Sequence, residues 1–257
     1  MGGGGFTRPG SSAALDRFVL SLTHKPVPKI CFVPTASGDQ RDQAMRFRER
    51  FDAWPCEPSI LWLFHLARDR VDPAEHLLDQ DAIYVGGGSM RNMLAIWREH
   101  GIAQAMRGAW ESGVVLAGLS AGAMCWFEGG LSMSGGAPEP VRGLGLLGGS
   151  LSVHLDSEPE RISAYRAAIS SGSLGPGYAA DDCAALLFED GALRECVASR
   201  EGARVVAVRG DGAGGVDEVD LPVRVLSEVE HGRHASKDLS AVSELRALRA
   251  ARRRWEE

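Results

Sequence analysis

The strongest constraint on the fold is a series of short apolar runs, each ending in small or turn-forming residues. These runs are KICFVPTAS (29–37), SILWLFHL (59–66), DAIYVGGG (81–88) and GVVLAGLS (113–120). Runs of this length and composition are typical of strands buried on both faces. Residues 39–54 and 89–113 carry apolar side chains at helical spacing, the second segment interrupted near Gly101. Strands alternating with helices predict an α/β fold with a doubly wound, mostly parallel sheet flanked by helices.

The second half of the chain has a different pattern. Residues 129–150 are rich in glycine and proline, which predicts an irregular loop. Residues 185–212 alternate and turn at Asp190-Gly191, and VRVLSE (223–228) adds a strand, so we expect a small antiparallel C-terminal extension. The segment 236–257 has the pattern of a charged helix. With no repeat and no clear linker, we expect residues 1–257 to form a single α/β domain.

Charge and composition narrow the classes of partner. A formal net charge of -6 argues against nucleic acid as a partner, and no apolar run is long enough to cross a membrane. The five cysteines are scattered without a C-x-x-C pair, which favours neither a disulfide framework nor a metal site and fits the cytoplasm. We therefore expect no metal site. A homodimer stays open.

The segment VLAGLSAGAMCWF (115–127) contains the pattern Gly-x-Ser-x-Gly around Ser120. At the end of a strand in a parallel sheet, such a turn lifts the serine hydroxyl clear of the sheet edge, where it can act as a nucleophile. The same short pattern also occurs as a tight turn whose serine caps the next helix. The motif alone leaves both interpretations open.

Two further features favour chemistry at this edge. YVGGGS (84–89) ends a strand with three glycines whose backbone N–H groups could bind an oxyanion. A phosphate loop is the weaker alternative, because neither standard glycine pattern is present. His154, in SVHLDSEPER (152–161), follows a predicted strand end downstream of Ser120 and could serve as its general base.

With these segments assembled, the chain resembles the peptidase E-like serine peptidases, which include aspartyl dipeptidases and cyanophycinases. The resemblance extends from GGGGF through CFVPTASGD, YVGGGSMRNMLAIWREHG and VVLAGLSAGAMCWFEGG to HLDSEPER and GYAADDCAAL. It implies a class I glutamine amidotransferase-like (flavodoxin-like) fold and cleavage of small peptides or polymers after aspartate, without metal or organic cofactor. It also implies Ser120 as nucleophile, His154 as base, and an oxyanion hole at Gly87, Gly88 and Ala121.

The acid that would orient the histidine is the point of departure from these relatives. Similar sequences carry an aspartate where this chain has Met133, and a methionine cannot orient an imidazole. Glu139 lies close to where cyanophycinase-like relatives place a glutamate, and Asp156 has the H-x-acid spacing of related amidotransferases. Both are candidates, with a slight preference for Glu139. Asp156 could equally be a loop cap.

A pocket for an aspartate side chain needs a fixed cation. Arg161 is the first candidate, because a helix starting near Pro159 would hold it near His154, and Arg91 beside the glycine loop is the second. An ion pair with Glu158 or Glu160 is the structural alternative for Arg161.

Two functional hypotheses remain. The first is a serine dipeptidase acting on aspartyl dipeptides or similar small acidic peptides, with an esterase or cyanophycinase-like activity as a variant of the same machinery. The second is a catalytically impaired relative that binds a small acidic ligand, for which Met133 is the reason. A thiol amidotransferase is disfavoured, because the turn carries Ser120 and Cys125 is better interpreted as buried.

Overall fold

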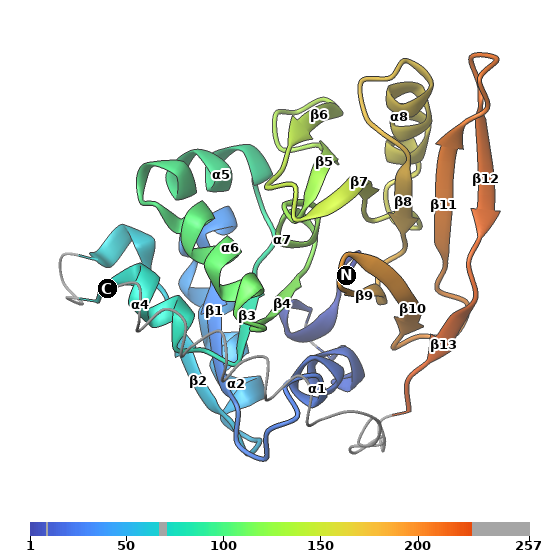
Figure 1. Cartoon of the computed structure of the whole chain (residues 1–257). Coiled ribbons are helices and arrows are strands. Elements are labelled where there is room, and N and C mark those ends of the chain that lie inside the picture. The colour runs from blue at the N-terminus through green and yellow to red at the C-terminus, as the bar shows by residue number, and fades with distance from the viewer. Residues whose placement is uncertain (9, 67–70, 228–257) are drawn as a thin grey trace.

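A computed structural model describes residues 1–8, 10–66 and 71–227 of the chain. It has a mixed α/β architecture in which a parallel sheet is flanked by helices, as the alternating pattern predicted (Figure 1). The parallel sheet has the strand order β2-β1-β3-β4. Its strands are β1 (Lys29–Val33), β2 (Glu57–Ile60), β3 (Ala82–Val85) and β4 (Val115–Gly118).

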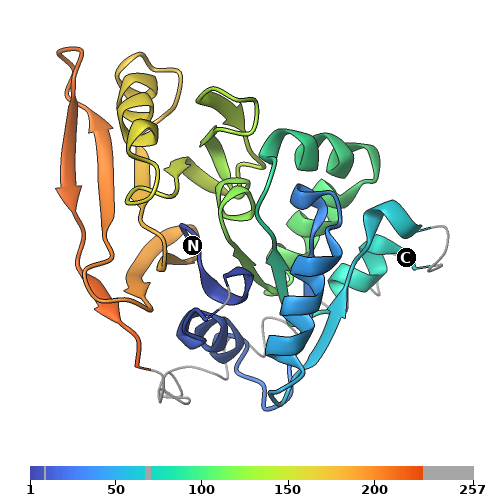
Figure 2. The same ribbon diagram turned by 180° about the vertical axis from the view of Figure 1, so that it is seen from behind.

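Both faces of this sheet are buried, which explains why its strands are almost continuously apolar. Along β1, Cys31 belongs to one hydrophobic cluster and Phe32 to another, because successive side chains point to opposite faces. Helices cover the two faces, with α1 and α2 on the side that Figure 2 turns toward the viewer. The helices are α1 (Ala14–Ser21), α2 (Arg41–Phe51), α4 (Pro73–Leu78), α5 (Met90–Glu99) and α6 (Ile102–Glu111).

The predicted interruption near Gly101 is confirmed. Gly101 has φ 69°, a left-handed conformation that ends α5 and lets α6 begin at once. The run 59–66 is only partly a strand, because β2 ends at Ile60 and residues Leu63–His65 form the short helix η3. Short helices also follow β1 and β4, namely η2 (Thr35–Ser37) and α7 (Ala121–Met124).

The rest of the described chain forms two further sheets. A six-stranded mixed sheet has the order β12-β11-β8-β7-β5-β6, with α8 (Pro159–Ser170) packed against it, and a three-stranded sheet has the order β13-β10-β9. Their strands are β5 (Phe127–Ser132), β6 (Glu139–Arg142), β7 (Leu147–Ser152), β8 (Gly177–Ala180), β9 (Ala184–Glu189), β10 (Ala192–Ala198), β11 (Val205–Gly210), β12 (Val216–Asp220) and β13 (Val223–Val225).

The expectation of an irregular loop over 129–150 is wrong. The segment contains most of β5 and β7 and all of β6, and β5 pairs in parallel with β7 and antiparallel with β6. Glycine there reflects close packing, since a Cβ on Gly130 would lie 2.8 Å from the Cβ of Met124. The hairpin predicted at Asp190-Gly191 is confirmed as the turn between β9 and β10, with positive φ at both residues.

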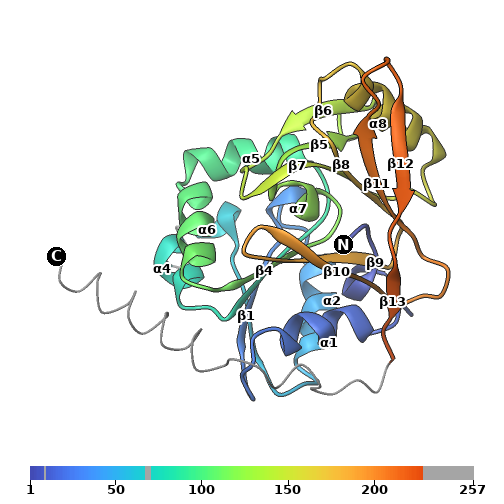
Figure 3. The ribbon, with the colours of Figure 1, turned by 45° about the vertical axis from the view of Figure 1, so that its right-hand side comes forward.

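The N-terminal segment Met1–Thr7 connects the parallel sheet to β9 (Figure 3). The Met1 carbonyl accepts from the Ser120 N–H at 3.1 Å, and the Gly2 N–H donates to the Ala184 carbonyl at 2.9 Å. The segment then turns through the short helix η1 (Gly5–Thr7) beneath α1 and α2. This placement brings the segment close to the turn that follows β4.

Some expectations fall outside the described part of the chain. The predicted helix over 236–257 lies there, and the single-domain assignment stays a prediction. Among residues 1–8, 10–66 and 71–227, none of the helices combines the length with the apolar composition that a membrane-spanning helix needs.

Candidate active site

Ser120 occupies a strained turn between β4 and α7. Its φ of 53° and ψ of -119° are unfavourable for a residue with a side chain. The turn is tight, because a Cβ on Gly118 would overlap the Gly122 carbonyl, and one on Gly122 would overlap the Val85 carbonyl. The glycines of the motif are therefore required by close backbone contacts, and the strain is that of a strand-to-helix turn that exposes its serine.

Three side chains from three strand ends form a hydrogen-bonded chain. His154 follows β7 and Asp182 follows β8, so both lie beyond the carboxyl ends of neighbouring parallel strands, like Ser120 after β4. His154 Nε2 lies 2.9 Å from Ser120 Oγ, and His154 Nδ1 lies 2.6 Å from Asp182 Oδ1. This is the geometry of a nucleophile, a base and an orienting acid.

Asp182 is a buried carboxylate that accepts hydrogen bonds at both oxygens. Oδ1 faces His154, while Oδ2 accepts from Ser157 Oγ at 3.1 Å and from Arg8 Nη2 at 3.3 Å. The hydrogen bond from His154 lowers the pKa of Asp182, and the Ser157 hydroxyl and the Arg8 charge act in the same direction, against the effect of burial. The site therefore favours an ionised acid beside the imidazole.

The N-terminal segment covers this contact. A Cβ on Gly3 would overlap Asp182 Oδ1 and lie 2.9 Å from His154 Cε1. The Gly3 carbonyl also accepts from the Cys183 N–H at 3.0 Å, which fixes the segment against the turn after β8. Only a residue without a side chain fits here without displacing the acid or the base.

The expectation that Glu139 or Asp156 orients His154 is wrong. Glu139 is the first residue of β6 and pairs with Arg91 at 2.7 Å, and its strand directs it toward α5 rather than toward His154. Asp156 turns away from the imidazole: its Oδ1 accepts from the Asp182 N–H at 2.9 Å and its Oδ2 pairs with Arg200 at 2.6 Å. The imidazole nitrogen that either acid was expected to hold is occupied by Asp182.

Asp182 was not predicted, because it lies 28 residues after His154, outside the segments around Glu139 and Asp156 that contain the candidate acids. A usable signal was present in GYAADDCAAL, where an apolar strand is followed directly by two acids. The sequence could not choose between them. Asp181 faces the other way, with its Oδ2 accepting from the Arg204 N–H at 2.8 Å.

The glycine loop after β3 lies directly against the serine. A Cβ on Gly87 would lie 3.1 Å from the Cβ of Ser120, and one on Gly88, where φ is 139°, would overlap the Ala36 carbonyl. Within the described residues, the N–H groups of Gly87, Gly88 and Ala121 donate to no other main-chain group. These three donors, expected to form an oxyanion hole, therefore have capacity for a ligand beside Ser120.

The two arginines expected to bind substrate have different surroundings. Arg161 lies in the first turn of α8, as expected. Its side chain, however, is only 5% exposed, pairs with Glu158 at 2.6 Å and donates to the Leu131 carbonyl at 2.8 Å. The ion-pair alternative is therefore correct, and the guanidinium joins α8 to β5. Arg91, on the first turn of α5, is 59% exposed and contacts Glu139.

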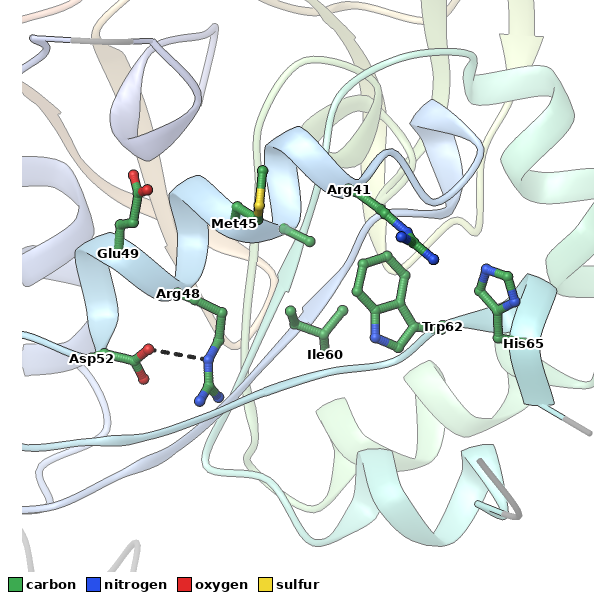
Figure 4. Close-up of a pocket in the computed structure, with 9 residues that line it drawn as sticks. Arg41, Met45, Arg48, Glu49, Asp52, Ile60, Trp62 and His65 are labelled. Atoms are coloured by element: carbon green, nitrogen blue, oxygen red, sulfur yellow. Dashed lines mark ion pairs between the residues drawn. The ribbon is translucent and has the colours of Figure 1, made fainter. Parts of the chain in front are cut away.

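The groove beside α2 and the thiol of Cys125 are not part of this site. A groove of about 620 Å³ between α2 and the segment 60–65 contains Arg41, Trp62 and His65 at one end, but none of the three linked side chains (Figure 4). Cys125 is fully buried, and burial raises its pKa well above the usual range, as expected for a structural thiol. Within the described residues, no three histidine, cysteine or acidic side chains are grouped as metal ligands.

Comparison with known proteins identifies the family of the chain. The model of peptidase family S51 matches residues 1–196. The chain belongs to peptidase family S51. It is 43% identical over 226 residues to the uncharacterized peptidase YgaJ of Bacillus subtilis (strain 168), covering 88% of this chain and 97% of that protein.

The S51 assignment also fits the fold. A crystal structure of a peptidase from an acI-B1 Actinobacterium superposes with a TM-score of 0.61 over 85% of this chain and 91% of that one, at 19% sequence identity. Such low identity supports the architecture alone. The peptidase E-like resemblance seen in the sequence is thus confirmed at the level of family and fold.

Proposed function

We propose that this S51 family member is a serine peptidase that hydrolyses small peptides, with Ser120 as nucleophile, His154 as general base and Asp182 as the acid that orients it. The observation that carries the proposal is the continuous chain from Ser120 Oγ to His154 Nε2 and from His154 Nδ1 to Asp182 Oδ1. Because Asp182 supplies an acid, Met133 no longer favours the impaired relative.

The reaction follows from these contacts. His154 Nε2 accepts the Ser120 hydroxyl proton as Oγ attacks the carbonyl carbon of the peptide bond. Negative charge develops on the carbonyl oxygen, where the N–H groups of Gly87, Gly88 and Ala121 would stabilise it. The imidazolium then protonates the leaving amine, and a water molecule activated by the same imidazole hydrolyses the ester formed with Ser120.

Asp182 contributes by holding the imidazole in one tautomer. A carboxylate on Nδ1 keeps the proton there, so that Nε2 faces Ser120 with its lone pair. Its lowered pKa keeps it ionised, which stabilises the imidazolium formed during attack. Asp182 itself stays deprotonated throughout.

The test of the nucleophile uses two readouts. Ser120→Ala should abolish hydrolysis of a dipeptide panel and labelling by a fluorophosphonate probe, while the melting temperature changes little. Ser112→Ala is a matched control, because Ser112 lies at the end of α6, outside the chain of Ser120, His154 and Asp182, and its hydroxyl donates to the Gly108 carbonyl of that helix. Labelling or turnover retained in pure Ser120→Ala would overturn the proposal.

For the substrate we propose a small acidic peptide, of the Asp-x type, bound through Arg91. The supporting observations are its position directly after the glycine loop and its exposed pair with Glu139. An ion pair so exposed to water contributes little free energy, so a substrate carboxylate can replace Glu139 as the partner of Arg91 with little loss of free energy. A guanidinium can then hold the carboxylate through two parallel hydrogen bonds.

Substrate selectivity tests this assignment. Arg91→Met should lower kcat/KM for Asp-x roughly 10- to 100-fold, the value of a lost charged hydrogen bond, and change it much less for a neutral dipeptide or ester. Arg98→Met, two turns further along the exposed side of α5, should change neither. Equal losses on acidic and neutral substrates would contradict the role of Arg91, and a general preference for esters would favour the esterase alternative.

A further inference from the structure

Asp182 is held through its main chain as well as through its side chain. Its N–H donates to Asp156 Oδ1 at 2.9 Å, and its carbonyl accepts from Arg200 Nη2 at 3.4 Å. The same Arg200 nitrogen lies 2.6 Å from Asp156 Oδ2. One acidic and one basic side chain therefore bracket both polar groups of Asp182's backbone.

Asp156 comes from the turn that carries the base. It is two residues beyond His154, and between them the Leu155 N–H donates to the Ala180 carbonyl at 3.1 Å. The turn after β7 and the turn after β8 are thus joined by two hydrogen bonds, one from each side. Arg200 lies in a third turn, the one after β10, and contacts both Asp156 and the Asp182 carbonyl.

The ion pair between Asp156 and Arg200 adds little to the stability of the fold. The side chain of Arg200 is 47% exposed and that of Asp156 33%, and ion pairs so accessible to water contribute about 0–1 kcal/mol. The Asp182 turn, by contrast, needs support, because Cys183 has φ 67° and the carboxylate must stay 2.6 Å from Nδ1. Outer contacts that orient a functional side chain have effects on rate far beyond their effect on stability.

We infer that Asp156 and Arg200 are positioning residues that fix the backbone of Asp182 so that its carboxylate meets His154. The inference rests on the proposed function, in which Asp182 orients the base. Asp156 touches neither Ser120 nor the imidazole in the described contacts, and it acts only through Asp182. The acid two residues after the histidine thus has a purpose different from the one its spacing suggested.

The experiment compares Asp156→Ala with Asp156→Asn and with a matched control. Asp156→Ala should lower kcat by roughly 10- to 100-fold with KM unchanged, because a shift of about 1 Å at the acid is costly. Asp156→Asn should restore most of this loss, since its amide oxygen can still accept from the Asp182 N–H. Glu218→Ala is the control, because its pair with Arg166 has the same 2.6 Å length and similar exposure but lies on β12.

A spectroscopic readout separates positioning from general damage. The proton on His154 Nδ1, hydrogen-bonded to a carboxylate, should give a far-downfield NMR resonance in the wild type that moves or disappears in Asp156→Ala, with the melting temperature changed as little as in Glu218→Ala. Equal kinetics in Asp156→Ala and Glu218→Ala, or a lower kcat with an unmoved resonance, would overturn the inference.

Asp182→Asn tells the inference apart from the function on which it rests. Loss of turnover in Asp182→Asn with normal turnover in Asp156→Ala overturns the positioning role alone. Wild-type turnover in Asp182→Asn overturns the proposed role of Asp182, and the inference with it.

Discussion

Two buried aspartates lie against the N-terminal segment, and their surroundings shift their pKa values in opposite directions. Asp182 lies against Gly3, and Asp16 of α1 lies against Gly5, where a Cβ would be 2.8 Å from its Oδ1. Asp16 accepts from the Tyr84 hydroxyl at 3.2 Å and pairs with Arg50 at 3.1 Å. Each carboxylate thus has an arginine, a hydroxyl and the same glycine-rich segment nearby.

The pKa values of the two carboxyl groups differ because desolvation and hydrogen-bond donors are balanced differently at the two sites. Burial raises the pKa of Asp16 to about 6, and the Arg50 charge, the Tyr84 hydroxyl and the Phe6 N–H oppose this shift only in part. The hydrogen bond from His154 lowers the pKa of Asp182 in spite of burial. Burial alone therefore does not decide the state of a carboxylate; a short hydrogen bond from an imidazole outweighs it here.

The two sites also differ in what they can do. Asp16 is enclosed among α1, α2 and β3 and fixes the start of the chain to the core. Asp182 lies at a strand end beside a histidine that reaches Ser120. Substitutions at Asp16 should affect folding, whereas those at Asp182 should affect catalysis.

The largest expected difference is in turnover. Asp182→Asn should lower kcat by roughly four orders of magnitude, as in other triads, because the amide favours the wrong imidazole tautomer. Asp16→Asn, which makes the same change at the other carboxylate, should leave kcat within a few-fold of the wild type. Steady-state kinetics on the same dipeptide checks both, and similar losses in the two variants would remove the distinction drawn between the sites.

The pH dependence of stability should differ in sign between the two carboxylates. Because the pKa of Asp16 is raised from 3.8 to about 6 on folding, its contribution favours the folded state below pH 4 and weakens as pH rises toward 6. This difference in the pKa of Asp16 between the folded and unfolded states corresponds to at most about 3 kcal/mol of unfolding free energy. Asp182 has a lowered pKa, so its contribution is present above its unfolded pKa and is lost as pH falls through the folded value.

Urea unfolding between pH 3 and 7 measures these slopes. In Asp16→Asn the decline in unfolding free energy between pH 4 and 6 should become shallower, and in Asp182→Asn the loss of stability at acid pH should become smaller. An unchanged profile in Asp16→Asn would show that its carboxylate is not desolvated as described.

The smallest expected effects come from the two glycines. Gly3→Ala should lower kcat by roughly 10- to 100-fold, since its Cβ displaces Asp182 and His154 by a fraction of an ångström to about 1 Å. Gly5→Ala should instead destabilise the fold by about 1–2 kcal/mol, because its φ of 57° disfavours a side chain. Steady-state kinetics and urea denaturation of both variants check that Gly3→Ala mainly lowers kcat and Gly5→Ala mainly lowers the free energy of unfolding. A lower free energy of unfolding with unchanged kcat in Gly3→Ala would contradict the placement of the segment.

Much of the fold could be predicted from the sequence. The strands β1, β3 and β4 and the helices α2, α5 and α6 could be predicted from the local spacing of apolar residues, whereas the run 59–66 overlaps β2 only at its first two residues. The segment 129–150 misled the prediction, since glycine marks both loops and strands against which other elements pack closely.

Ser120, His154 and the glycine loop could be proposed as site residues from the sequence by itself, because each lies in a short local motif at a strand end and the motifs together resemble those of a known family. The partner of His154 was not. Asp182 reaches it from a strand 28 residues away, and the choice of Asp182 over Asp181, Asp156 or Glu139 depends on which way each side chain points once β7 and β8 have paired. Side-chain direction at a strand end is set by register, turn conformation and neighbouring donors, and these exist only when the sheets and the N-terminal segment have come together.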